Sequence, residues 1–348
     1  MIRDVLSDLV AGKPLDFERA RGAMAEIMDG QATPAQIGAF LVALRMKGET
    51  VDEIAGMATA MRERCASIHA DGDGRLVDLC GTGGAPLRTF NVSTIAMFVV
   101  AGAGVRVAKH GNRAVTSACG SADLLEALGV RVDLEPPEVE RILRETGLCF
   151  MFAPKFHPAM RHAIAPRKEI GLRTVFNVLG PLTNPARATG HVLGVFSPDL
   201  VERLTPVALR LGMERALVVH GLAGMDEICL CGPTLVGEVK DGETKRYVVT
   251  PRDLGFKRTS PESLAGSEPS LAAGEAVRIL RGEKGPKRDM VLVNAAAGVY
   301  VGGKSATLAS GVEPAREALD SGRAFDRLIS FVRATGGDPS KVEDHGRA

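Results

Sequence analysis

The sequence predicts an α/β fold in which a short helical region precedes a larger region with a mostly parallel central sheet. Residues 1 to about 68 repeat apolar side chains at helical spacing. From Leu76 onward, short apolar runs alternate with glycine turns and helical segments, which is typical of parallel sheets. With 348 residues and 45% hydrophobic content, the chain can build one large domain or two unequal ones.

Two helices of the first region have clear starting signals. Thr33 is placed to cap a helix that begins at Pro34 and ends at Gly48. Thr50 and Glu53 form a capping box for the next helix. The apolar faces are Ile37, Phe40, Leu41 and Leu44 in the first helix, and Ile54, Met57, Ala58 and Met61 in the second. Short helices of this kind bury such faces against each other or against a second copy of the chain.

The larger region contains a series of short apolar runs that are expected to be strands. They are Leu76–Cys80, Val105–Ala108, Val130–Leu134, Leu148–Phe152, Val192–Phe196 and Ala216–His220. Leu235–Lys240 and Tyr247–Thr250 flank Asp241-Gly242 and predict a β-hairpin. The proline-rich segment 154–185 interrupts the alternation and is expected to cross back to the helical region.

Composition excludes several classes of protein. The formal net charge of +1 offers no global attraction for nucleic acid or acidic membranes. The six cysteines contain no CxxC pair and stand among apolar neighbours, which predicts buried thiols in a reducing compartment. No signal peptide is apparent at the start, and the apolar run Ile95–Val105 is too short to span a bilayer. A soluble, cytoplasmic protein is expected.

The first segment that carries chemistry is DLCGTGGAPLRTFNVST, Asp78 to Thr94. A buried strand runs into Gly81–Gly84, and a helix begins near Asn91. Glycines let the backbone approach an anion closely, and the helix start adds amide donors. The alternative is a tight turn with an ordinary cap, but the hydroxyl groups of Ser93 and Thr94 favour a phosphate-binding loop. The loop is neither a Walker loop nor a GxGxxG fingerprint.

The second segment is KHGNRAVTSACGSADLLEALG, Lys109 to Gly129. Its donors are Lys109, Asn112, Arg113, Thr116, Ser117 and Ser121. Asp123 and Glu126 resemble a capping box for a helix that Gly129 ends. The alternative is a solvated polar loop. Because this loop also follows an apolar strand, both loops are expected to face one crevice at the carboxyl ends of the strands.

The third segment is HGLAGMDEICL, which contains the adjacent carboxylates Asp226 and Glu227. Carboxylate pairs suit Mg²⁺, which bridges protein oxygens and diphosphate. An isolated Asp-Glu pair is more often a solvated turn. The two anion-binding loops elsewhere in the chain are what make a metal site plausible here.

The fourth segment, Phe152 to Ala186, contains His157 and Arg167 ten residues apart. An arginine fork binds a small carboxylate through two parallel hydrogen bonds. Taken alone, both residues are equally consistent with surface positions on a crossover.

Together these motifs closely resemble the anthranilate phosphoribosyltransferase family. The matching stretches are GTGG with NVST, KHGNR with GSADLLEALG, HPAMR with a downstream Arg, LGPLTNPA, HG..G.DE and NAAAGVYVG, and they cover nearly the whole chain in order. The resemblance implies a small α-helical domain and a large α/β domain of the nucleoside phosphorylase/phosphoribosyltransferase type. Residues 1–68 with about 163–185 would form the helical, dimerisation domain, and 69–162 with 186–348 the catalytic domain. It also implies a homodimer.

The implied activity is that of a glycosyltransferase (a pentosyltransferase). The 5-phosphoribosyl group of 5-phosphoribosyl 1-diphosphate would pass to anthranilate, giving N-(5-phosphoribosyl)anthranilate and diphosphate in tryptophan biosynthesis, with Mg²⁺ as cofactor. The expected partners are these two small molecules, without nucleic acid or membrane.

The resemblance also implies site residues. Phosphoribosyl diphosphate would contact Gly81, Gly84, Ala85, Thr89, Asn91, Val92, Ser93, Thr94, Lys109, His110, Gly111, Asn112, Arg113, Ala114, Val115, Thr116, Ser117 and Ser121. Anthranilate would meet Gly81, His110, Asn112, His157 and Arg167, with Arg167 on its carboxylate. Mg²⁺ would be held by Ser93, Asp226 and Glu227. No strong general base is implied; His110 and His157 are candidates for orienting the amine or for taking its proton late.

One position departs from the family. An Asp usually follows GTGG, but here Ala85 and Pro86 follow it. A carboxylate near the diphosphate is therefore missing, which leaves the number of Mg²⁺ ions open.

Two other functions stay open from the residues alone: a pyrimidine nucleoside phosphorylase, which needs no metal, and a nucleic-acid-binding relative of the fold. Asp226 and Glu227 disfavour the first, and the near-neutral charge disfavours the second.

Overall fold

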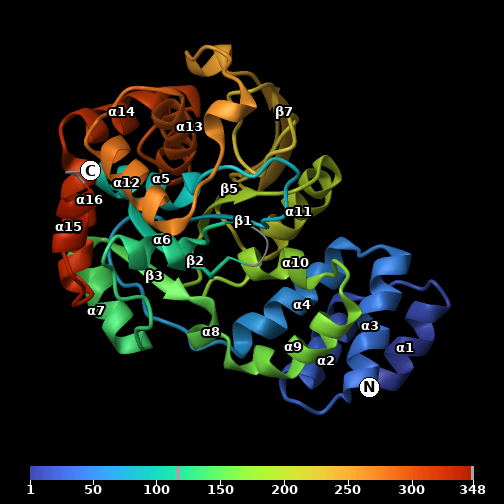
Figure 1. Cartoon of the computed structure of the whole chain (residues 1–348). Coiled ribbons are helices and arrows are strands. Elements are labelled where there is room, and N and C mark those ends of the chain that lie inside the picture. The colour runs from blue at the N-terminus through green and yellow to red at the C-terminus, as the bar shows by residue number, and fades with distance from the viewer. Residues whose placement is uncertain (115–117, 346–348) are drawn as a thin grey trace.

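The computed structural model describes residues 1–114 and 118–345, and it divides into a helical region and an α/β region (Figure 1). The chain starts with the helices α1 (Ile2–Val10), α2 (Phe17–Met28), α3 (Pro34–Lys47) and α4 (Val51–Glu63). The crossover segment forms α8 (Ala153–Phe156), α9 (Arg161–Ile170) and α10 (Phe176–Leu179). In Figure 1, α9 (green) lies beside the blue α2 and α3, with which it is in contact, so the predicted return to the helical region is confirmed.

The α/β region is built on one seven-stranded sheet in the order β3-β2-β1-β4-β5-β6-β7. The strands are β1 (Leu76–Gly81), β2 (Arg106–Gly111), β3 (Leu148–Phe152), β4 (Gly190–Gly194), β5 (Arg215–Gly221), β6 (Thr234–Lys240) and β7 (Glu243–Val249). The first five are parallel, and β6 and β7 form the predicted antiparallel hairpin. The predicted fold class is therefore confirmed.

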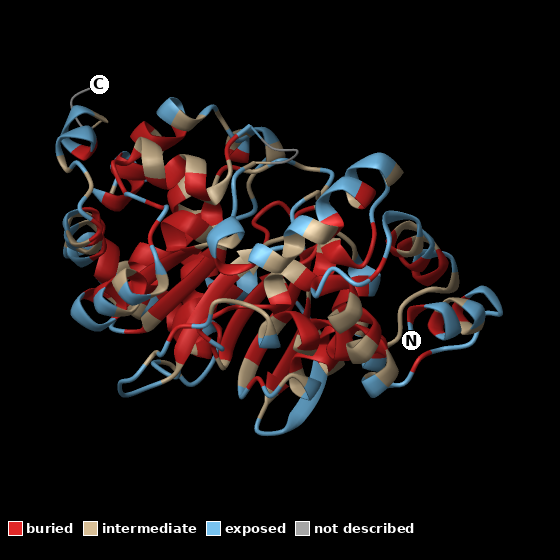
Figure 2. Cartoon of the chain, turned by 90° about the horizontal axis from the view of Figure 1, so that it is seen from below, coloured by how far each residue is buried: buried red, intermediate tan, exposed pale blue. Residues whose placement is uncertain are grey.

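Helices cover both faces of this sheet. They are α5 (Val92–Gly102), α6 (Ser121–Ala127), α7 (Pro136–Thr146), α11 (Pro198–Arg210), α12 (Pro269–Leu280), α13 (Pro286–Val301), α14 (Val312–Asp320), α15 (Arg323–Ala334) and α16 (Ser340–His345). Alternate residues of β4 serve opposite faces: Val192 joins the core that includes α5 and α13, and Leu193 joins a core shared with α11 and the first four helices. In Figure 2 the buried residues gather on the strands. The sheet thus separates two cores, one of which continues into the helical region.

Local sequence signals account for the boundaries in the first region. Thr33 and Thr50 each cap a helix, and both capping boxes form. Gly48 follows α3 with φ of 84°, a backbone conformation that favours glycine. None of the helices among residues 1–114 and 118–345 is both long and apolar enough to cross a membrane.

Three local expectations are corrected. Residues 130–134 form no strand; Val130, Val132 and Leu134 are buried while the residues between them are exposed, so their alternation reflects packing without strand pairing. The strand expected at 192–196 lies two residues earlier, at 190–194. Asp123 does not cap α6 with Glu126. It is the third residue of α6, and its carboxylate accepts hydrogen bonds from the amides of Gly120 and Ala114, both at 2.9 Å. The helix therefore begins at Ser121, with Gly120 as its N-cap and Asp123 bonded back to the Gly120 amide.

Glu53 → Gln is expected to destabilise the helical region. The Glu53 carboxylate is fully buried and accepts hydrogen bonds at 2.8 Å each from the amides of Leu15 and Thr50 and from Nζ of Lys47. An amide at this position leaves the Lys47 ammonium without its counter-charge, so the free energy of unfolding should fall by about 1–3 kcal/mol in urea titrations. Asp52 → Asn is the matched control, because Asp52 meets Arg210 only in an exposed pair at 3.5 Å. Equal losses in the two variants would contradict the role of Glu53.

Candidate active site

A cavity of about 1210 Å³ lies between the helical region and the carboxyl ends of the parallel strands. The loops after β1 and β2 line one side, and Arg45, Glu49 and the segment 171–178 of the crossover line the other. Strand order reverses between β1 and β4, and crevices at such points are where open α/β sheets bind ligands. Both predicted anion loops therefore do face one crevice.

The loop after β1 depends on its glycines. Gly83 and Gly84 have φ of 66° and 74°, which side-chain-bearing residues rarely adopt. A Cβ on Gly81 would lie 2.6 Å from Oδ2 of Asp226. Asn91 precedes the first residue of α5 and donates to the carbonyl of Cys119 at 3.0 Å, which ties this loop to the second one. The backbone of the loop is thus left open toward the cavity.

Asp226 and Glu227 both contact this loop from the far side of β4. Oδ2 of Asp226 accepts a hydrogen bond from the amide of Gly83 at 2.9 Å, and Oε2 of Glu227 accepts one from the hydroxyl of Thr89 at 2.8 Å. Burial raises the pKa of both carboxyls, and in Glu227, where the Asp226 charge adds to the effect, the pKa reaches about 8. Each keeps its second oxygen without a hydrogen bond to another side chain among the described residues. Two crowded carboxylates with spare oxygens fit a hard divalent cation.

The two cations of the second loop are both engaged by the protein. The ammonium of Lys109 is buried under the first loop, where it donates to the Leu79 carbonyl and, at 3.1 Å, to the hydroxyl of Ser93. Arg113 pairs with Glu126, at 2.8 Å through Nη2, and with Asp123. The charge of Lys109 is therefore buried at the wall of the cavity. Arg113 is held against α6 by its ion pairs.

His110 and His157 lie against each other, with ring centroids 5.0 Å apart. Burial lowers the pKa of His110 well below its ordinary value, helped by the neighbouring His157 ring, and burial lowers the pKa of His157 to about 4. Both imidazoles are therefore neutral at neutral pH. His110 lines the cavity, but His157 lies behind it. Nε2 of each ring is buried without a hydrogen-bond partner among the described residues.

Two arginines of the crossover segment reach the cavity. Arg167 lies on α9 with its guanidinium 4.8 Å from the centre of the Phe176 ring, and it forms no ion pair among the described residues. Burial lowers its pKa. Arg173 donates to the carbonyl of Gly84 at 2.6 Å and stacks on Phe196 at 4.5 Å. Arg167 is thus an uncompensated cation at the cavity wall, and Arg173 joins the crossover to the glycine loop.

Most of the predicted site residues are brought together by the fold. The cavity is lined by Gly81, Gly84, Ala85, Thr89, Asn91, Val92, Ser93, Thr94, Lys109, His110, Gly111, Asn112, Arg113, Ala114, Ser121, Arg167, Asp226 and Glu227. Val115, Thr116 and Ser117 lie outside the described residues. Arg88 and Arg173 also line the cavity and were not predicted. Arg88 stands within the first motif, where its charge was a usable signal, whereas nothing local to Arg173 indicates its contact with Gly84.

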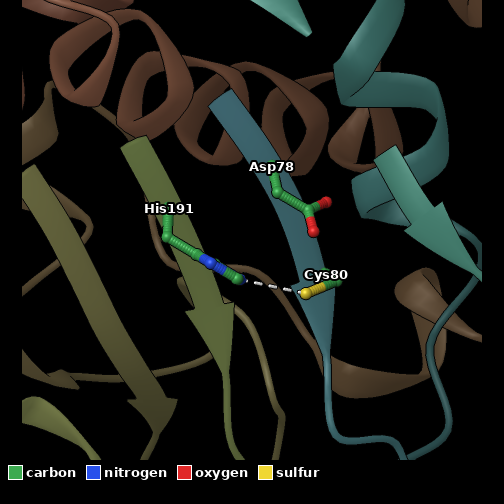
Figure 3. A group of neighbouring side chains, drawn as sticks. All are labelled: Asp78, Cys80 and His191. Atoms are coloured by element: carbon green, nitrogen blue, oxygen red, sulfur yellow. Dashed lines mark hydrogen bonds between the residues drawn. The ribbon is translucent and has the colours of Figure 1, made fainter. Parts of the chain in front are cut away.

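A buried group of side chains lies on neighbouring strands below the crevice (Figure 3). Cys80 and His191 turn toward each other, with Sγ 3.1 Å from Nε2. The Asp78 carboxylate accepts hydrogen bonds from the amide of His110 at 3.3 Å and from Asn184 at 2.7 Å. Asp78, Cys80 and His191 are close enough to share a metal ion, but the Asp78 carboxylate already accepts two hydrogen bonds, and Cys80 Sγ and His191 Nε2 are each other's partners. Nδ1 of His191 has no hydrogen-bond partner among the described residues. The group therefore joins β1, β2 and β4 as a hydrogen-bonded cluster.

Comparisons with known proteins agree with this architecture. Residues 3–65 match the family described as glycosyl transferase family, helical bundle domain, and residues 73–325 match its a/b domain. Fold and site together thus define a two-domain glycosyltransferase. The anthranilate phosphoribosyltransferase of Pelotomaculum thermopropionicum is 51% identical over 97% of both chains. That of Chloroflexus aurantiacus is 52% identical over 97% of this chain and 99% of the relative. The chain belongs to the anthranilate phosphoribosyltransferase family, as the motifs predicted.

Solved structures support the same assignment. Anthranilate phosphoribosyltransferase from Thermus thermophilus has a TM-score of 0.91 and 46% identity, covering 96% of this chain and 99% of that one. The enzyme from Saccharomyces cerevisiae in complex with PRPP and Mg has a TM-score of 0.88 and 27% identity, covering 96% and 98%. Neither alternative function, the pyrimidine nucleoside phosphorylase or the nucleic-acid-binding protein, is favoured by these relatives.

Proposed function

We propose that this protein transfers the 5-phosphoribosyl group from 5-phosphoribosyl 1-diphosphate to anthranilate, as a cytoplasmic enzyme of tryptophan biosynthesis. The observation that carries the proposal is one cavity that combines an open glycine loop, the Asp226–Glu227 pair and the unpaired Arg167. These groups match the diphosphate, its metal ion and the anthranilate carboxylate, respectively. The full-length similarity to anthranilate phosphoribosyltransferases supports the same reaction.

Each part of the cavity has a role in this proposal. The backbone and hydroxyls of the first loop bind the diphosphate, and the second loop, including Asn112 and Ser121, binds the ribose and its phosphate. Asp226 and Glu227, with the Ser93 hydroxyl, would hold Mg²⁺. Arg167 binds the anthranilate carboxylate next to His110.

The reaction breaks the bond between carbon 1 of the ribose and the diphosphate and forms one to the amine nitrogen of anthranilate. When bound, Mg²⁺ supplies positive charge to the departing diphosphate. The loop amides stabilise the same charge without rearranging. The aromatic amine is already a nucleophile, so the protein has to position it more than activate it. The neutral His110 fits such a positioning role, and its Nε2, unpartnered among the described residues, can accept the amine proton after the new bond has begun to form.

The direct test is an assay with anthranilate, phosphoribosyl diphosphate and Mg²⁺ that follows the loss of anthranilate fluorescence. The proposal expects a loss that requires all three components. If inorganic phosphate and a pyrimidine nucleoside react instead, the protein is a phosphorylase and the proposal fails.

We further propose that residues 1–68 with about 163–185 form a dimerisation domain, beside a catalytic domain of 69–162 with 186–348. Ala35, Ala39 and Met46 follow one another at helical spacing on the exposed side of α3, and Met46 is 83% exposed. This apolar stripe is separate from the face of α3 that packs in the core. Sedimentation equilibrium should give twice the chain mass, and Met46 → Glu with Ala39 → Glu should give monomers. A wild-type monomer at micromolar concentration would contradict the dimer.

Ala85 → Asp is expected to change the Mg²⁺ optimum and the apparent KM for phosphoribosyl diphosphate, with little effect on the KM for anthranilate. Ala85 lines the cavity, and the amide of Leu87 donates to the Gly224 carbonyl at 3.0 Å, which holds the loop near the Asp226 segment. A carboxylate at this position attracts metal and repels bare diphosphate, and these opposed effects leave the direction to experiment. The check is a pair of Mg²⁺ titrations of activity. If the two Mg²⁺ profiles superimpose, the side chain at position 85 does not interact with the metal ion or the diphosphate.

A further inference from the structure

A second cavity, of about 380 Å³, lies at the amino ends of the strands, whereas the candidate active site lies at their carboxyl ends. It is bounded by the end of α4, by residues 187–189 before β4, and by residues 210–212 at the end of α11. Three arginines line it: Arg62, Arg187 and Arg210. The cavity therefore lies where the helical region meets the amino ends of two parallel strands.

Arg62 is held rigidly in this cavity by backbone groups. Its Nε donates to the carbonyl of Leu182 at 2.8 Å, and its Nη1 donates to the carbonyl of Leu211 at 3.1 Å. No carboxylate lies within 4.0 Å of its guanidinium nitrogens among the described residues. Burial, with a contribution from the charge of Arg187, lowers the pKa of Arg62 to about 10. Arg62 is thus a fixed cation without a counter-charge.

Arg187 adds a second uncompensated charge. Its side chain forms no hydrogen bond or ion pair with the part of the chain that the structure describes. Its backbone has φ of 49°, in the left-handed region that residues other than glycine rarely occupy, and its amide donates to the Asn184 carbonyl at 3.0 Å. Strained backbone of this kind is often found at ligand-binding positions.

The nearby carboxylates do not neutralise this pair. Glu63 lines the cavity but is engaged by Arg21 at 2.8 Å and by Arg64 at 3.6 Å. Asp52 is 3.5 Å from Arg210, so it offsets the third arginine only. The charge that remains is that of the buried Arg62 and of Arg187, an exposed residue of the same cavity whose charge acts on Arg62. An anion between them would relieve this repulsion.

We propose that this cavity binds a small phosphate-class oxyanion between Arg62 and Arg187. Planar guanidinium groups bind phosphate oxygens in pairs of parallel hydrogen bonds. The volume admits such an anion with several waters, since a water molecule occupies about 30 Å³ of liquid. Because Arg62 comes from α4 and Arg187 from the α/β region, the bound anion would stabilise the contact between the two regions. Leu182, whose carbonyl accepts from Arg62, directly follows Pro181, which lines the candidate active site.

The test compares the effect of anions on melting temperature in the wild type and in Arg187 → Gln. Inorganic phosphate and diphosphate are titrated separately without Mg²⁺, with chloride used to hold the ionic strength constant. Gln, like Arg, is unbranched at Cβ, so the substitution introduces no new class of backbone restriction at this position. Arg187 makes no side-chain bond to the described part of the chain, so the variant should fold. The matched control is Arg333 → Gln, an exposed arginine on α15 away from this cavity.

The apparent dissociation constant for the tighter of the two anions should be at least fivefold weaker in Arg187 → Gln and unchanged in Arg333 → Gln. Arg187 → Lys, which keeps the charge but not the fork, should give an intermediate value. A larger loss of the diphosphate response than of the phosphate response in Arg187 → Gln would identify the ligand of this cavity as a diphosphate, and the reverse would identify it as a free phosphate. Identical anion responses in wild type and Arg187 → Gln, or equal weakening in Arg333 → Gln, would overturn the site. The active-site loops, which are proposed to bind diphosphate, are unchanged in all four proteins, so the difference between the wild type and Arg187 → Gln reports on this cavity alone.

Discussion

Replacing Asp226 with Asn and Glu227 with Gln together is expected to lower kcat/KM by roughly three orders of magnitude while leaving the fold intact. Removing a single preorganised charge-stabilising group from an active site already costs about 10²–10³ in rate. Here both carboxylates lose their charge, although each can keep its contact with the glycine loop, through Gly83 and Thr89. The variant should therefore fail in catalysis and metal dependence rather than in folding.

Three measurements separate these effects. Activity is followed over a wide Mg²⁺ range, the melting temperature reports the fold, and Glu243 → Gln, an exposed carboxylate on β7, is the matched control. Because burial raises the pKa of both carboxyls, removing their charge should not destabilise the variant. Wild-type activity of the double variant at limiting Mg²⁺ would remove both residues from the site.

Arg167 → Ala is expected to raise the apparent KM for anthranilate by about 10–100-fold, with a much smaller change for phosphoribosyl diphosphate. A hydrogen bond to a charged group contributes about 1.5–3 kcal/mol, which corresponds to such a factor. Arg167 forms no ion pair among the described residues, so its charge is available to a substrate carboxylate. The expected split between the two substrates follows because only anthranilate loses a bidentate partner.

Arg167 → Lys keeps the charge and should recover part of the affinity, because an ammonium cannot reproduce two parallel hydrogen bonds. Ile164 → Ala is the control on the same helix, since Ile164 is exposed and outside the cavity wall. Equal increases in both KM values for Arg167 → Ala would show that the residue acts through the position of α9 rather than through anthranilate.

Sequence alone predicted those parts of the fold that depend on neighbouring residues. The predicted cap at Thr33 and the predicted capping box at Thr50 both form, because a cap and the amide it accepts from are only three residues apart. Five of the six expected parallel strands exist because apolar runs of that length find partners in one sheet. The exception, 130–134, begins Val-Arg-Val as 105–107 does, yet its apolar residues are buried without strand pairing, and nothing within the segment reveals that difference.

For the site, the sequence determined which loops carry the chemistry, because glycines that allow positive φ and clustered donors are local properties of the chain. Only the tertiary structure decided what each side chain meets. It buried the Lys109 ammonium under the first loop, placed His157 behind His110, and brought Arg173 to Gly84, 89 residues away. It also joined Arg62 to Leu211, 149 residues away, beside Arg187. Such contacts form between segments whose separation in sequence says nothing of their distance in space, so they follow from how the sheet and helices pack.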